Sequence, residues 1–394
     1  MNLPIYLDNH AATRLDARVL EAMLPYFSQT FGNPGSSTHS FGRAAHEAVD
    51  AARQQIAAGI GAQPNEIVFT SGATESNNLA IRGVAERRHR KGRHLLSVTT
   101  EHPSVLDPLR KLAGRGFEVT LLRVVQAPDG RAGLITAGQV AEAIRDDTIL
   151  VSIMLANHEI GAIPPLAEIG RLCKQRGVLL HTDATQAVGK IPVHVGELQV
   201  DLMSFTAHKM YGPKGIGALY VRRSAPRVRL EPLIDGGGQQ WGLRSGTLNV
   251  PGIVGLAKAL ELCLRDLPDE SARLRRLRDQ LYRGLESNLP EVSLNGPALD
   301  LPDSRLPGNL NVQFPGVAGE TLLINMPELA LSSGSACTSA SPEASHVLLG
   351  LGLSETAAQS SVRFGLGRSN TEEEVEYAIG RVTDTVARLR SMTP

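Results

Sequence analysis

The sequence has few cysteines, no excess charge of either sign and no long apolar run. Cys173, Cys263 and Cys337 are its only cysteines and share no CxxC spacing, so we expect neither a disulfide framework nor a structural zinc site. Basic and acidic residues number 40 each, which favours neither nucleic acid nor a membrane surface as a partner. No run approaches the roughly 18 apolar residues of a membrane span, and no signal peptide is evident. We therefore expect a cytoplasmic protein.

A length of 394 residues with 42% hydrophobic content is enough to bury the cores of about two domains. Short runs rich in β-branched residues alternate with helical patterns, which predicts an α/β fold whose mostly parallel central sheet is flanked by helices. Ligands of such sheets bind at the carboxyl ends of the strands, where polar residues cluster in this sequence. The predicted strands lie at 66–70, 94–100, 117–122, 149–155, 177–183, 201–207 and 215–221.

The pattern changes after a glycine-rich stretch at 235–247. Helical sequence follows and is predicted to break at Pro268, because proline lacks the amide hydrogen that a helix needs. We expect a domain change near 255–270. Further strands are predicted around 310–314 and 330–337, and a closing amphipathic helix begins at about 371.

Lys209 lies in SFTAHKMYGPKG, where a predicted strand ends in a polar turn. Most lysines are solvated surface residues, and this one taken alone would be too. Asp183, in HTDATQ, ends another strand and would lie at the same edge of the sheet. A lysine that forms an imine and an acid that keeps a pyridine nitrogen protonated are what pyridoxal 5'-phosphate (PLP) requires. Gln186 could donate to the phenolic oxygen of PLP, or could face solvent.

A phosphate group would need amide hydrogens at the start of a helix. SGATES (71–76) follows a predicted strand and precedes a helical run, which places Gly72, Ala73 and Thr74 at a positive helix terminus. Any capped helix looks similar, so the turn counts only together with Lys209 and Asp183. GPKG (212–215) lacks the spacing of a phosphate loop, and Lys214 is interpreted as structural.

Three more residues are candidates for contact with the ligand or substrate. His102 follows another strand and could stack on a flat ligand or carry a proton, although a lone histidine is more often structural. Arg363 could bind a substrate carboxylate through two hydrogen bonds, or form an ordinary surface ion pair. Cys337 lies in LSSGSACTSAS, a stretch of small residues that indicates an exposed, movable thiol able to act as a nucleophile.

These segments together resemble the cysteine desulfurases of the bacterial iron–sulfur-cluster and nitrogen-fixation type, in the class-V aminotransferase family. The resemblance runs through almost the whole chain. It includes YLDNHAAT, FGNPGSSTHSFG, FTSGATESNNLAI, TEHPSVL, DDTILVSIMLANHEIG, HTDATQAVGK, HKMYGPKGIGALYVRR, RSGT, SSGSACTSAS and RFGLGR.

The resemblance implies a PLP-dependent transferase of fold type I that forms a homodimer. A large PLP-binding domain would span 15–260, and residues 1–14 and 261–394 would form a small α+β domain carrying the Cys337 loop. Its activity would be removal of sulfur from L-cysteine, giving L-alanine and a Cys337 persulfide for an unidentified acceptor or scaffold protein.

The resemblance also assigns roles by position. Lys209 would bind PLP as a Schiff base, and His102 would stack on the ring and move protons. Arg363 would hold the substrate carboxylate, and Thr247 would reach the phosphate of the neighbouring subunit's cofactor. The remaining contacts to PLP would come from Asp183, Gln186, Ala73, Thr74, His158, Thr206 and His208.

Several positions differ from the family's usual sequence. His158 replaces the second asparagine of Asn-Asn-Glu, and Thr206 with Ala207 replaces Ser-Gly. Asp235 and the Gln-Gln-Trp run at 239–241 replace histidine and acidic groups near the mouth of the site. Two alternatives stay open. One is a selenocysteine lyase or another sulfur lyase of the same fold, and the other is a catalytically inactive PLP-fold binding protein.

Overall fold

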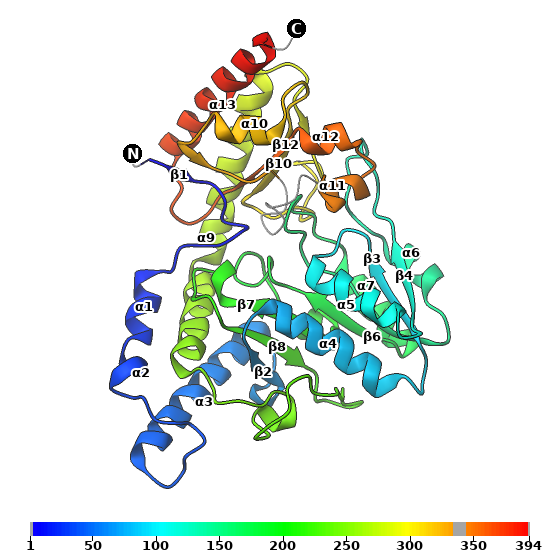
Figure 1. Ribbon diagram of the computed structural model, residues 1–394, viewed down its shortest axis with the longest axis vertical. Coiled ribbons are helices and arrows are strands. Elements are labelled where there is room, and N and C mark those ends of the chain that lie inside the picture. The colour runs from blue at the N-terminus through cyan, green and yellow to red at the C-terminus, as the bar shows by residue number, and fades with distance from the viewer. Residues whose placement is uncertain (1–2, 334–343, 393–394) are drawn as a thin grey trace.

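The computed structural model describes residues 3–333 and 344–392. Its larger lobe is built on a seven-stranded sheet with the strand order β2-β8-β7-β6-β5-β3-β4 (Figure 1). β8 runs antiparallel to β2 and β7, and the other neighbours are parallel. The predicted mostly parallel sheet is confirmed, with strands at Ile67–Thr70 (β2), His94–Val98 (β3), Glu118–Leu122 (β4), Thr148–Ser152 (β5), Leu179–Asp183 (β6), Leu202–Thr206 (β7) and Gly217–Val221 (β8).

Helices cover both faces of this sheet, which explains why most of its strands are continuous apolar runs. One face packs on α4 (Ala73–Arg88) and α5 (Pro103–Ala113). The other face packs on a larger set of helices, namely α1 (Ala17–Met23), α3 (Ser40–Ile60), α6 (Ala137–Ala143), α7 (Leu166–Arg176) and the first part of α9. Short helices α2 (Pro25–Ser28) and α8 (Val195–Leu198) complete the lobe.

The smaller lobe is an α+β layer with its own apolar core. Its antiparallel sheet has the order β12-β10-β9 and packs on helices from the C-terminal part of the chain. The elements are β9 (Ser293–Leu294), β10 (Asn309–Gln313), α10 (Gly319–Ile324), α11 (His346–Gly350), α12 (Glu355–Gln359), β12 (Ser361–Gly365) and α13 (Glu372–Met392). The predicted strand near 310–314 and the closing helix are therefore confirmed.

The long helix α9 (Val250–Asn288) joins the two lobes (Figure 1). The predicted break at Pro268 is wrong, because α9 continues through this proline. Leu256 and Leu260 pack in the core of the large lobe, and Leu277 and Leu281 pack in the core of the small one. Burial at both ends of the helix offsets the hydrogen bond that proline removes.

The two ends of the chain meet in the small lobe. β1 (Ile5–Tyr6) pairs in parallel with β11 (Leu329–Ala330), and Ile5 and Leu7 lie in the small-lobe core. The strand predicted at 330–337 includes only the last residue of β11, residues 331–333 form no strand, and 334–337 lie outside the described residues. We propose that the domain boundary lies within α9 and that residues 1–14 belong to the small domain.

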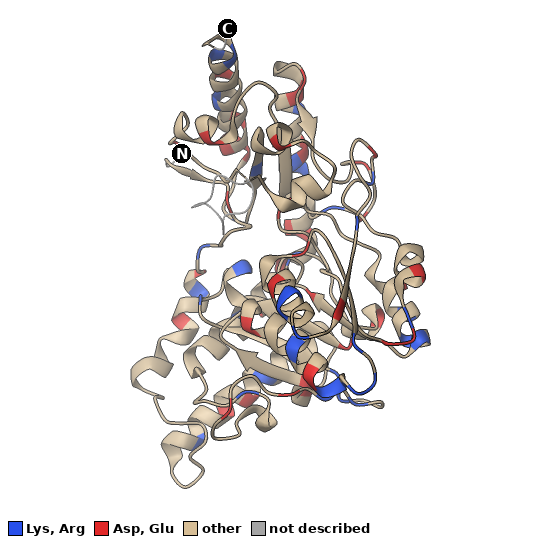
Figure 2. Cartoon of the chain, turned by 45° about the vertical axis from the view of Figure 1, so that its right-hand side comes forward, with Lys and Arg blue, Asp and Glu red and all other residues tan. Residues whose placement is uncertain are grey.

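Acidic and basic side chains are interspersed over both lobes (Figure 2). Over the ranges that the structure describes, no helix combines the length and the apolar character needed to cross a membrane.

Candidate active site

A cavity of about 430 Å³ opens at the carboxyl ends of β5, β6 and β7. Its wall is formed by several segments that lie far apart in the sequence, the first at His10 and the last at Arg363. The cavity brings together most of the residues singled out in the sequence. Those are Ala73, Thr74, His102, His158, Asp183, Gln186, Thr206, His208, Lys209 and Arg363.

Lys209 lies at the end of a short 3₁₀ turn (Ala207–Lys209) that directly follows β7. Its amine donates hydrogen bonds to the backbone carbonyls of His10 (2.7 Å) and Ala11 (2.5 Å). The lysine is therefore held at the cavity wall by the N-terminal segment, and the alternative of a solvated surface lysine is wrong.

Asp183 is the last residue of β6 and is 6% exposed. Its carboxylate accepts hydrogen bonds from the Asn77 side-chain amide (2.7 Å) and the Thr185 backbone amide (2.9 Å). Within residues 3–333 and 344–392 it forms no salt bridge, so its negative charge is left for a cationic group in the cavity. β6 and β7 are neighbours, which places Asp183 and Lys209 at the same sheet edge.

Gln186 is buried and does not face solvent. Its side-chain nitrogen donates to the His10 carbonyl (2.9 Å), and its side-chain oxygen accepts from the amine of Lys190 (2.6 Å). His10 Nδ1 lies 3.0 Å from the same oxygen. His10 and Lys190 thus belong to the site, although nothing in their local sequence pattern indicated it.

The start of α4 forms one end of the cavity, with Ala73 and Thr74 at its first two positions. Amides at these positions have no acceptor inside the helix and attract anions. Arg244 donates to the Glu75 carboxylate (2.8 Å), which reduces the negative charge near the helix start. The absence of a side chain at Gly217 lets the backbone of Gly72 lie close to β8, because a Cβ on Gly217 would lie 2.7 Å from the Gly72 Cα.

Thr206 and His208 line the same cavity as this helix start. The Thr206 hydroxyl lies 3.1 Å from His208 Nδ1 and donates to the Ile216 carbonyl (2.9 Å). Burial, together with the positive charges of Lys209 and Lys214, lowers the pKa of His208 to about 4. Lys214, interpreted from sequence as structural, lines the cavity too.

His102 caps the N-terminus of α5, and its Nδ1 accepts from the Ser104 amide (3.1 Å). Its ring meets that of His158 edge to face, with 5.3 Å between centroids. Burial, and secondly the neighbouring His158, lowers the pKa of His102 to about 4. Asn77 donates to both Ser104 Oγ (2.8 Å) and Asp183, so one side-chain amide links His102 to the carboxylate.

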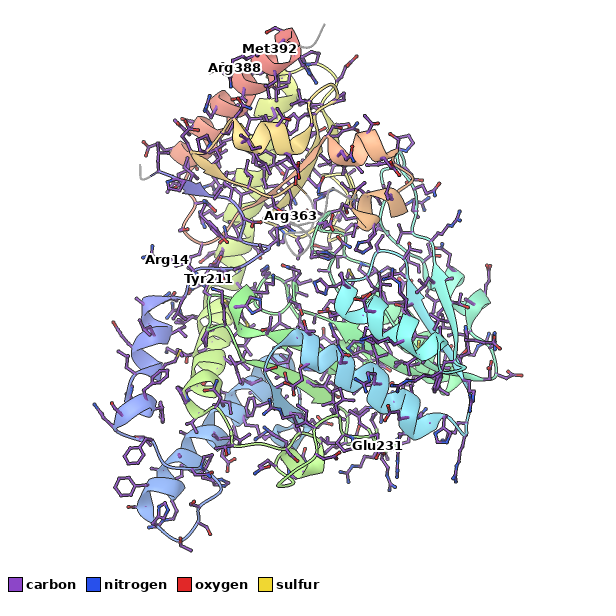
Figure 3. All side chains as sticks on the ribbon, viewed as in Figure 1. Arg14, Tyr211, Glu231, Arg363, Arg388 and Met392 are labelled. Atoms are coloured by element: carbon purple, nitrogen blue, oxygen red, sulfur yellow. The ribbon has the colours of Figure 1, made fainter. Side chains whose placement is uncertain are left out.

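Arg363 lies on β12 and is 1% exposed. Figure 3 shows it between the two lobes, where its guanidinium donates to the Asp8 carboxylate (2.8 Å) and the His158 carbonyl (2.9 Å). It does form an ion pair, but a buried one in the cavity wall rather than an ordinary surface pair.

Two predicted residues are not in the cavity of this chain as described. Thr247 is exposed on the glycine-rich segment, and its proposed contact with a neighbouring subunit stays a prediction. Cys337 lies outside the described residues. The other two cysteines, Cys173 and Cys263, are free, and burial raises the pKa of their thiols to about 12 and about 11. Both are packed residues.

A family model described as "Aminotransferase class-V" matches residues 5–378. The chain belongs to this family. It is 54% identical over 394 residues to the protein named cysteine desulfurase IscS of Anaeromyxobacter dehalogenans (strain 2CP-C), covering 100% of this chain and 95% of that protein. It is 52% identical over 396 residues to the cysteine desulfurase IscS of Klebsiella pneumoniae (strain 342), with the same coverage. Within the family, the chain is therefore a member of the cysteine desulfurases.

Solved structures agree with this assignment. A structure titled "NifS-like protein" superposes with a TM-score of 0.89 at 37% identity, over 98% of this chain and 100% of that one. A second, titled "SspA in complex with cysteine", gives a TM-score of 0.79 at 39% identity, over 92% and 98%. The predicted fold type I architecture is confirmed.

Proposed function

We propose that this cysteine desulfurase binds PLP in the cavity between Lys209, Asp183 and the start of α4, and transfers sulfur from L-cysteine through Cys337. The observation that carries the proposal is the meeting of these three features in one cavity, because each matches a different part of the same cofactor. When bound, PLP would act as an electron sink that weakens bonds at the α-carbon of an amino acid.

The residues present fit PLP on structural grounds. Asp183 offers a buried carboxylate, without a salt bridge to any described residue, for the pyridine nitrogen. Lys209 offers an amine at the cavity wall. The free amides of Ala73 and Thr74, with Thr206 and His208 beside them, offer donors for a phosphate. A buried carboxylate costs free energy unless a positive group compensates for it, and a bound cationic ring nitrogen would do so.

His102 has the position and protonation state of a proton carrier. Its lowered pKa means that the imidazole is neutral near pH 7, and a neutral imidazole can exchange a proton with a bound substrate. Its edge-on neighbour His158 lies on the same wall and supports a further contact with the bound ring. Gln186 would direct its remaining amide hydrogen at the phenolic oxygen.

Arg363 would hold the substrate carboxylate, because its buried guanidinium presents donors in a planar fork. The Cys337 thiolate would then attack the substrate sulfur. A sulfur–sulfur bond forms, the carbon–sulfur bond breaks, and a proton completes L-alanine. Cysteine plus enzyme thiol thus give alanine plus enzyme persulfide, with no external oxidant. The persulfide sulfur would pass to an acceptor protein in the synthesis of iron–sulfur clusters or other sulfur compounds.

We further propose a cytoplasmic homodimer. Three phenylalanines at the α2–α3 end of the large lobe, Phe27, Phe31 and Phe41, are 61%, 64% and 53% exposed. Apolar groups gathered in this way on a surface favour burial against another chain. The exposed Thr247 would then be free to reach the partner's phosphate.

The cofactor proposal is tested by absorbance after reconstitution with PLP. Wild type should be yellow, and Lys209→Ala should lose the visible band. Lys214→Ala is the matched control, because it removes the other lysine of the cavity wall and should keep the colour. A colourless wild type, or a Lys209→Ala protein with the wild-type band, would contradict the proposal.

The role of Cys337 is tested separately. Cys337→Ser should keep the colour and still change its spectrum on adding cysteine, yet release no sulfide with a reductant. Cys173→Ala, at a buried thiol, should release sulfide like wild type. Equal turnover of cysteine by Cys337→Ser and wild type would refute the persulfide step. Alanine formation from selenocysteine by both proteins distinguishes a desulfurase from a selenocysteine lyase, which would depend less on Cys337.

A further inference from the structure

Lys190 is a partly buried lysine at the back of the site that the mechanism above does not use. It lies one helical turn after Gln186, in the turns that follow β6. Its amine makes one hydrogen bond within the described parts of the chain, to Gln186 Oε1 at 2.6 Å. A second cavity, of only about 20 Å³, lies on its other side. The charged or titratable groups around the amine are Lys209, Arg363, Cys263, Glu270, His10 and His208.

This position is costly for a lysine. Burial, and next the positive charge of Lys209, lower the pKa of Lys190 to about 7. A lysine serving only to fill space would be replaced at no loss by an apolar residue, since burying an amine costs free energy. We therefore look for a role of the buried amine in its short hydrogen bond to Gln186.

The bond to Lys190 and the contacts with His10 together decide which way the Gln186 amide faces. The two ends of a glutamine amide have similar shapes, so only hydrogen-bond partners distinguish them. When Lys190 is protonated its ammonium group can only donate, which requires the Gln186 oxygen to point at Lys190. The nitrogen then lies on the opposite side, where it donates to the His10 carbonyl at 2.9 Å. Gln186 lines the cavity, so the second hydrogen of this nitrogen can serve a bound ligand.

We propose that Lys190 is a positioning residue that locks the Gln186 amide with its nitrogen toward the cavity, as the donor to the ring oxygen of the cofactor. The inference rests on the proposed PLP site and adds to it the residue that sets the polarity of one of its hydrogen bonds. With the amide reversed, two oxygens would face each other across the cavity, and the contact would become repulsive.

The test is a pH titration of the visible absorbance of the PLP-loaded protein. In Lys190→Met the amide is held by His10 alone, so the ring oxygen has a less firmly fixed donor and loses a nearby positive charge. Both changes make a proton at that oxygen harder to remove. The midpoint of the absorbance change should rise by about one pH unit or more, a tenfold change in proton affinity. Lys190→Arg, which keeps the charge and the donors, should stay close to wild type.

A double-mutant cycle separates orientation from charge. In a Gln186→Leu background there is no amide to orient, so Lys190→Met should move the midpoint by less than half as much as it does with Gln186 present. An equal shift in both backgrounds would show that Lys190 acts by its charge alone and would overturn the proposal. An unchanged midpoint in a coloured Lys190→Met protein would overturn it as well.

Gln186→Glu keeps the test decisive should Lys190→Met not fold. The glutamate retains the contact with Lys190 as an ion pair but turns only an acceptor toward the cavity, so the midpoint should rise. A Gln186→Glu midpoint equal to that of wild type would refute the amide as donor. A wild-type protein that takes up no PLP would instead refute the proposed function, and this inference with it.

Discussion

His181 makes the stability of this protein depend on pH in a way that can be calculated. It lies on β6, two residues before Asp183, and is fully buried. Its ring nitrogens lie 2.8 Å from Ser152 Oγ and 3.0 Å from Ser204 Oγ, so it bridges three neighbouring strands beneath the cavity. Burial lowers its pKa to about 4. The folded protein therefore holds this histidine in its neutral form.

The direction and size of the effect follow from linkage. Unfolded His181 would bind its proton near pH 6.5, and the folded form only near pH 4. Between these values the unfolded state binds more protons, so the stability that His181 contributes is present above pH 6.5 and is lost as the pH falls toward 4. At pH 5 the loss relative to pH 7.5 is about 2 kcal/mol from this residue alone.

The assay is urea unfolding followed by circular dichroism at pH 7.5 and pH 5, for wild type and His181→Gln. The glutamine can still bond to a serine but does not titrate. The variant will differ from wild type in absolute stability, so the informative quantity is the change between the two pH values. That change should be about 2 kcal/mol smaller in His181→Gln. An equal change in both proteins would refute a neutral, buried His181 as the cause, because the other histidines contribute equally to both.

Three further predictions concern the cavity. Asp183→Asn should fold but lower kcat/KM for cysteine by about 100-fold or more, because a neutral amide cannot hold a cationic ring nitrogen; steady-state kinetics measure this, and near-normal activity would contradict the role. Arg363→Lys should raise the KM for cysteine about tenfold and change kcat less, since one point charge replaces a planar fork; an unchanged KM would remove Arg363 from the substrate site. Gly217→Ala should lower stability by about 1–3 kcal/mol and weaken PLP binding, because its Cβ would lie 2.7 Å from the Gly72 Cα; thermal melting and PLP titration check both, and a variant equal to wild type would show that the approach is not tight.

Local patterns were enough to predict the sheet and one edge of the site. Most strands of the large sheet are short apolar runs followed by polar residues, and parallel strands bring their carboxyl ends to one edge. Lys209 and Asp183 could therefore be placed together from sequence. The start of α4 was predictable for the same reason, because its glycine and hydroxyl residues directly follow β2.

The remaining features depend on contacts between distant parts of the chain. Pro268 was expected to end a helix, and only the two cores that α9 bridges explain why it does not. Asn77 looks like any polar residue of a helix, yet it connects Asp183 to Ser104. The contact of Lys190 could not be predicted, since no periodic signal marks an amine that points at a side chain of its own turn.

The arrangement around Arg363 shows how the two lobes together would form the proposed substrate site. A guanidinium that is 1% exposed would be strongly destabilising if unpaired, and Asp8, two residues after β1, provides the compensating charge. One terminal nitrogen of the guanidinium donates to Asp8, and the other donates to the backbone carbonyl of His158, which belongs to the large lobe. The Nε atom has no hydrogen-bond partner in the portion of the chain that the structure describes. Arg363 is thus neutralised enough to be buried but keeps a donor for a carboxylate, and its position depends on both lobes.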